Sequence, residues 1–148
     1  MKKVVSICLV VLLMVGAVAC SSSSGRTLEE LIKAKLGTPR SEEDAGVEAV
    51  VHNEDEQYLT VKYRMIPVFK TKRLMEKQIS MKLRVLLPKV VVFDNVETVA
   101  VVVMLPVNDT WTKAMTIETS KESIQEIDWK EIKDKEILEA LDSYIAEP

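Results

Sequence analysis

The sequence predicts an α+β fold: a four-stranded, mostly antiparallel sheet made of two hairpins, with helices packed mainly on one face. Two pairs of runs, within 47–65 and 96–119, alternate apolar and polar residues around a short polar turn, which is typical of a β-hairpin. Between the two hairpins, and again at both ends of the domain, apolar residues recur with the spacing of a helix. The expected order is helix, hairpin, long helix, hairpin and helices, in one domain of residues 27–148.

The first helix is expected from Leu28 to Leu36. Thr27 followed by Glu30 fits a capping box, in which each side chain pairs with the other residue's amide. Gly37 and Pro39 then end the helix. A hairpin follows, with strands over 47–52 and 58–65 and a polar turn at 53–56.

The long helix is expected from Lys70 to Phe93. Its apolar residues recur at steps of three or four, at Met75, Ile79, Leu83, Leu86, Val90 and Phe93. Pro88 removes one helical hydrogen bond, so residues 89–93 have a strand as the alternative. We favour a helix kinked at Pro88, because the apolar spacing continues through the proline.

The segment Val96 to Val107 is apolar on both sides, which is typical of a strand in the middle of a sheet. The strand 111–119 returns after a turn at 108–110, and Ser120 is expected to cap a short helix through Ile127. Residues 128–131 repeat the capping-box spacing before the last helix. Its apolar face is expected to contain Ile137, Leu138, Leu141, Tyr144 and Ile145.

The first twenty residues have the pattern of an export signal. Lys2 and Lys3 precede residues 4–19, which carry no charge, and Ala17-Val18-Ala19-Cys20 is followed by Ser21 to Gly25. This pattern resembles the lipobox of bacterial lipoproteins, although the family usually has Leu where Ala17 stands. The resemblance, limited to residues 1–25, implies cleavage before Cys20 and a diacylglycerol on its sulfur. An uncleaved anchor helix, or a signal cut elsewhere without lipid, is the alternative.

The resemblance divides the chain into a signal peptide at 1–19, a lipidated Cys20 with a Ser-rich tether at 20–26, and the domain at 27–148. It implies that the protein is held by lipid on the extracytoplasmic side of the cell membrane or outer membrane. The two cysteines of the sequence are Cys8 and Cys20, so the domain has no thiol for a disulfide, a nucleophile or a metal.

Charge is unevenly distributed along the chain. Without Lys2 and Lys3, 18 basic residues oppose 23 acidic ones, yet residues 62–89 are strongly basic and contain only one acid, Glu76. Leu74, Met81 and Val85 fall together opposite the main apolar stripe of the long helix, beside Lys70, Arg73, Lys77 and Arg84. This combination suits an anionic membrane surface or an acidic partner. Packing against the acidic first or last helix is the alternative.

Catalytic motifs are absent from the sequence. Glycine occurs only at 16, 25, 37 and 46, which excludes a glycine-rich phosphate loop in the later part of the chain, and neither G-x-S-x-G nor H-E-x-x-H occurs. The cluster His52 to Glu56 has cation-binding residue types, but it matches no zinc or calcium pattern and is expected to be a solvated hairpin tip. We therefore expect no catalytic residue, no metal and no cofactor.

The sequence thus favours a lipid-anchored envelope lipoprotein with a small, non-enzymatic binding or scaffolding domain at the membrane surface. Its expected partners are the membrane, through Cys20, and an anionic lipid or acidic protein, with no nucleic acid. An exclusion or immunity lipoprotein of a mobile element is the alternative, and an envelope hydrolase stands last. A concave pocket that gathers at least two of Glu48, His52, Lys113 and Ser120 would favour the hydrolase.

Overall fold

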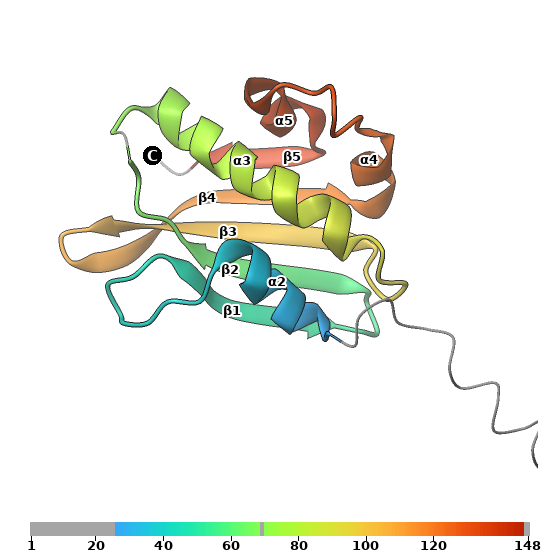
Figure 1. Cartoon of the computed structure of the whole chain (residues 1–148), viewed down its shortest axis with the longest axis horizontal. Helices are drawn as coiled ribbons and strands as arrows, with labels where there is room; N and C mark the ends of the chain where they lie inside the picture. Colours follow the sequence, from blue (N-terminus) through green and yellow to red (C-terminus); the bar gives the residue numbers. More distant parts are fainter. Residues whose placement is uncertain (1–25, 69, 147–148) are drawn as a thin grey trace, which may run out of the picture.

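The computed structural model describes residues 26–68 and 70–146, so the expected signal peptide, Cys20 and most of the tether lie outside the described residues. A five-stranded mixed sheet carries the helices on one face (Figure 1). In chain order the elements are α2 Leu28–Leu36, β1 Gly46–Asn53, β2 Tyr58–Arg64, α3 Lys72–Val90, β3 Thr98–Val107, β4 Thr110–Ser120, α4 Lys121–Glu126, α5 Asp134–Ala140 and β5 Ser143–Ala146.

The two expected hairpins are confirmed, but the sheet differs in detail from the expectation. Its order is β1-β2-β3-β4-β5, and β2 and β3 are parallel neighbours, so α3 is the crossover between them. The other three pairings are antiparallel. The prediction of four strands is wrong, because β5 pairs with β4 along Met115–Glu118.

Residues of β5 were expected on the last helix. Tyr144 and Ile145 instead alternate across a short edge strand, and α5 ends at Ala140. Pairing with β4 gives this segment backbone hydrogen bonds that a frayed helix end would lack. No helix begins at the capping box expected at 128–131. Asp128 Oδ1 instead accepts the Lys130 amide at 3.0 Å and the Glu131 amide at 3.4 Å in a turn, and α5 begins at Asp134.

The expected end of α2 is found, together with its capping box. Thr27 Oγ1 accepts the Glu30 amide at 3.2 Å, and Glu30 Oε2 accepts the Thr27 amide at 3.0 Å. Gly37 follows with φ 90°, a left-handed conformation that glycine adopts without strain. Its carbonyl accepts the Val47 amide at 2.9 Å, so this glycine joins the end of α2 to the start of β1.

α3 is shorter at both ends than the expected Lys70 to Phe93. It begins at Lys72, which leaves Lys70 in the preceding segment, and it continues through Pro88 to Val90. Residues 91–93 form a turn, so the alternative strand at 89–93 is wrong. β1 has a bulge between Val47 and Ala49, which shifts its register against β2.

β3 is the central strand, as expected. Val99, Val101 and Val103 are buried and belong to the core beneath the helices, while Ala100 and Met104 are buried on the opposite face. α3 contributes Ile79, Leu83, Leu86, Leu87 and Val90 to the same core. Ser120 caps α4 as expected, its side chain accepting the Ser123 amide at 3.2 Å.

Val101→Asp should lower the free energy of unfolding by about 3–5 kcal/mol, because it places an unpaired charge in the core. Val101 is 1% exposed and lies between Val61 and Ile117. Val107→Asp, at the exposed end of the same strand, is the control and should change stability by less than about 0.5 kcal/mol. Urea unfolding measures both, and equal midpoints would contradict the central position of β3.

Candidate functional site

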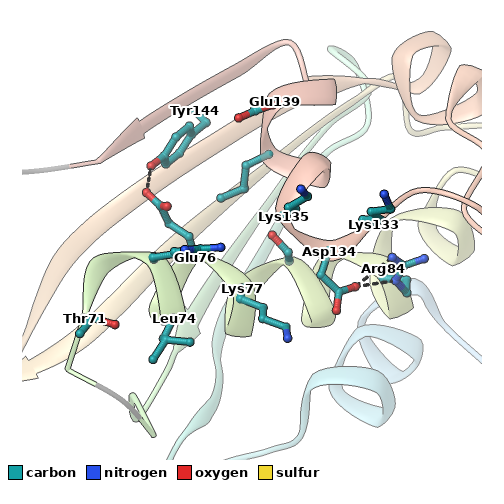
Figure 2. Close-up of a pocket in the computed structure, with 13 residues that line it drawn as sticks. Thr71, Leu74, Glu76, Lys77, Arg84, Lys133, Asp134, Lys135, Glu139 and Tyr144 are labelled. Atoms are coloured by element: carbon teal, nitrogen blue, oxygen red, sulfur yellow. Dashed lines mark hydrogen bonds and ion pairs between the residues drawn. The ribbon is translucent and has the colours of Figure 1, made fainter.

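A groove of about 990 Å³ lies between α3 and α5 (Figure 2). It is lined by Thr71, Arg73, Leu74, Glu76, Lys77, Ser80 and Arg84 of the α3 side, by Lys133, Asp134, Lys135, Leu138 and Glu139 of the α5 side, and by Tyr144 of β5. Four of the expected site residues, Arg73, Leu74, Lys77 and Arg84, are thus brought together. Lys70, Met81 and Val85 are exposed but do not line the groove.

Arg84 closes one end of the groove. Its Nε and Nη2 donate to Asp134 Oδ1 at 3.0 and 2.9 Å. Nη1 donates to the Trp129 carbonyl at 2.5 Å, and Nη2 also donates to the Ile132 carbonyl. This guanidinium holds the 127–133 loop against α3, so the internal pairing that the sequence left as an alternative applies to Arg84.

A tyrosine and a glutamate close the other end. The Tyr144 hydroxyl donates to Glu76 Oε1, and Lys72 Nζ lies 3.9 Å from the same oxygen. Burial, followed by the hydrogen bond to Glu76, raises the pKa of Tyr144 to about 12. Glu76, the only acid of α3, is therefore directed toward β5.

The middle of the groove is electropositive. Arg73, Lys77 and Lys133 are exposed. The side chains of Arg73 and Lys77 form no ion pair or hydrogen bond in the part of the chain that the structure describes, whereas the Lys133 amide donates to Glu136 Oε2 at 3.3 Å. Five basic side chains line the groove against three acidic ones. Its chemistry favours an anionic group over a cationic one.

The outer surface of α3 is apolar beside this groove. Leu74, Met81 and Val85 share one face of the helix, and Val92, which is also exposed, follows just beyond the end of the helix. We call these four residues the α3 ridge. The sequence analysis identified the first three but did not single out Val92.

A second groove of about 530 Å³ lies where α3 begins over the end of the sheet. Met65, Met75, Val103, Leu105 and Met115 give it apolar walls. Sequence reasoning missed it, because the apolar pattern of the strands and of the long helix does not show where a groove remains open between them.

The face of the sheet that carries no helix has its own polar cluster. Glu48 accepts hydrogen bonds from Lys62 Nζ at 2.7 Å and Arg64 Nε at 2.9 Å. These contacts, that of Lys62 foremost, lower the pKa of the Glu48 carboxyl despite its partial burial. Arg64 lies 5.3 Å from the centre of the Trp111 ring, whose Nε1 donates to the Glu42 carbonyl at 2.6 Å. Each member is engaged with its neighbours, which is typical of a structural cluster.

The residues that would have favoured a hydrolase lie apart. His52 Nε2 is hydrogen-bonded with the Asn95 carbonyl at 2.7 Å, and Ser120 caps α4. The expected hydrolase residues were Glu48, His52, Lys113 and Ser120. The first groove is lined by none of them, and the second is lined by Lys113 alone. Among residues 26–68 and 70–146 no three His, Cys, Asp or Glu side chains are placed to hold a metal, and no helix is both long and apolar enough to cross a membrane.

A serine–aspartate cluster beside α4 was missed by sequence reasoning. Asp142 accepts hydrogen bonds from Ser123 Oγ at 2.5 Å and from the Ser120 amide at 2.6 Å. The Ser123 hydroxyl, followed by that amide, lowers the pKa of Asp142. The cluster joins the end of α5 to the start of α4, and no signal in the sequence places residue 142 beside residue 120.

Arg84→Lys should lower the free energy of unfolding by about 2 kcal/mol, because an ammonium cannot reproduce the fork that reaches Asp134 and two carbonyls. Arg73→Lys is the matched control, since Arg73 is exposed on the same helix, and should change stability by less than about 0.5 kcal/mol. Thermal and urea unfolding of both variants test this. Equal losses would show that the Arg84 contacts do not hold the loop.

Each of the three tyrosines should titrate at higher pH in the folded protein than in the unfolded chain. Hydrogen bonding to Glu118 raises the pKa of Tyr58 to about 12, Tyr144 also rises to about 12, and burial raises the pKa of Tyr63. Unfolded tyrosine loses its proton near pH 10, so between pH 10 and about 12 the folded state binds more protons and stability falls as pH rises.

Phenolate absorbance measures this titration, with denatured protein as the reference. Tyr144→Phe is the control, and should remove about one third of the absorbance change above pH 10 without shifting the remainder. A midpoint near 10 while circular dichroism remains native would contradict the tyrosine contacts.

No family model matches the chain, and neither a curated protein nor a solved structure matches it.

Proposed function

We propose that this protein is a lipid-anchored lipoprotein of the bacterial envelope whose domain is a non-enzymatic binding or scaffolding module at the membrane surface. The attachment rests on the sequence pattern ending at Cys20 and the polar residues that follow it. The tether at 20–26 extends at most about 25 Å, so it would keep the domain beside the bilayer.

The observation that carries the binding role is the surface of α3. Along one helix it combines the electropositive groove with the exposed α3 ridge. Exposed apolar residues in a continuous line are typical of surfaces that contact a partner or a membrane. The surplus of basic over acidic side chains in the groove gives such a surface a preference for anionic partners.

A binding role is also supported by how the candidate catalytic side chains are used. Glu48, His52 and Ser120 each bond to neighbouring residues at different places in the fold. A general base and a nucleophile within hydrogen-bonding reach of each other would be needed for acid–base hydrolysis.

Cys20→Ala should leave the protein as an uncut precursor that incorporates no fatty acid, because the modified sulfur is then missing. Cys8→Ala is the matched control: it removes the other cysteine of the chain and should be processed and labelled like the parent. Metabolic labelling with an alkyne fatty acid, together with the shift in size on a gel, measures both properties. Processed, fatty-acid-labelled protein in the Cys20→Ala strain would refute the anchor.

A further inference from the structure

The exposed apolar side chains of this protein gather in one region. Nine large hydrophobic residues are exposed in the described chain, and six of them lie between residues 66 and 92. Four form the α3 ridge, in which Met81 is 53% exposed, Val85 45% and Val92 70%. A helix of the core layer thus presents a second apolar stripe to solvent, opposite the stripe that it buries.

Cations lie on both sides of the α3 ridge. Arg73 and Lys77 border it toward α5, and Lys82 and Lys89 border it toward α2. Glu76 lies away from the ridge, bonded to Tyr144. Two acids of the flanking helices are paired within their own surroundings, Asp134 of α5 with Arg84 and Glu29 of α2 with Lys33, while Glu139 of α5 also lines the groove. An apolar line with cations on both edges is the pattern of a helix that lies in the plane of an anionic bilayer.

The described chain begins in the same layer as the ridge. α2 packs beside α3, and α2 begins at the end of the molecule where α3 ends (Figure 1). A lipid attached before α2 would therefore hold the helical layer, rather than the bare face of the sheet, within reach of the bilayer. The tether is too short for the domain to sample distant surfaces freely.

We propose that the α3 ridge docks on the anionic membrane that holds the lipid at Cys20, so that the domain lies with its helices against the bilayer and the bare face of its sheet outward. This rests on the proposed function, since the anchor supplies the local concentration that docking needs. The docked side chains are the four of the ridge, and the cations beside them contact lipid phosphates.

Other occupants of the ridge fit less well. A second copy of this chain would bring two cation-bordered ridges together, and like charges at close range repel. An acidic protein would match the charge, but it would have to compete with a bilayer that the tether keeps beside the domain.

Site-specific fluorescence on the full, lipidated protein tests the proposal. The mature chain has no cysteine besides Cys20, so Met81→Cys or Val85→Cys adds one reactive thiol for an environment-sensitive dye. Val51→Cys is the matched control, because Val51 is 61% exposed on the bare face of the sheet. Each protein is reconstituted in vesicles of phosphatidylcholine, with or without phosphatidylglycerol, that contain brominated lipid as a quencher.

Dyes at residues 81 and 85 should be quenched and blue-shifted in phosphatidylglycerol vesicles, whereas the dye at residue 51 should not. Quenching of the dyes at residues 81 and 85 should be weaker in vesicles of pure phosphatidylcholine. It should also weaken as salt is added, because the Debye length shortens from about 10 Å at 0.1 M to about 3 Å at 1 M. Each cation near the surface strengthens docking about fivefold, so Lys77→Gln with Lys89→Gln should shift the docked-to-undocked ratio about 25-fold. Arg40→Gln with Lys113→Gln is the control of equal charge and should leave it unchanged.

Three results would overturn the proposal. In the first, dyes at residues 81 and 51 are quenched equally or not at all while the protein still floats with the vesicles; the anchor then stands and only the docking fails. In the second, the dye at residue 81 is shielded in native envelopes but not in protein-free vesicles, which assigns the ridge to a protein partner. In the third, the parent protein does not associate with vesicles, which removes the proposed function as well.

Discussion

The parallel pairing of β2 with β3 determines the rest of this structure. Two parallel strands cannot be joined by a tight turn, so the chain must return along the sheet before β3 begins. The 19 residues of α3 make that return, a length of about 28 Å. Because α3 crosses the middle of the sheet, it divides the helical layer, with α2 on one side and α5 on the other. The groove lies between this central helix and α5, and the ridge is on the face of α3 that stays exposed.

Local patterns were enough to predict the elements whose signals are local. The capping box at Thr27, the alternation in both hairpins and the helical spacing through Pro88 all appear as expected. The prediction of a helix at Ser143 to Ala146 was wrong, because four residues are too few to distinguish the two-residue period of a strand from the period of a helix. The parallel pairing also escaped prediction, since alternation within a strand does not reveal which strand lies beside it.

The candidate site was predictable as a face of one helix but not as a groove. Helical periodicity placed Arg73, Leu74 and Lys77 together, since it depends only on their spacing. Arg84 follows the same spacing, but it is bonded to Asp134 and to the Trp129 carbonyl. Its pairing could not be predicted, because these partners lie about fifty residues later in the chain. The sequence shows which positions carry a basic side chain. Whether that side chain is free to bind a ligand depends on acidic and carbonyl partners that only the fold brings near it.

The bulge in β1 has a consequence if the proposed lipid anchor holds the protein at high density on a membrane. Molecules confined to a plane collide in a restricted set of orientations, and an open sheet edge is a template for pairing with a neighbouring strand. In this sheet one edge is β1, whose register is broken between Val47 and Ala49, and the other is β5, which has only four residues. Neither edge offers a long, regular ladder, so crowding in two dimensions would not readily convert these domains into fibres.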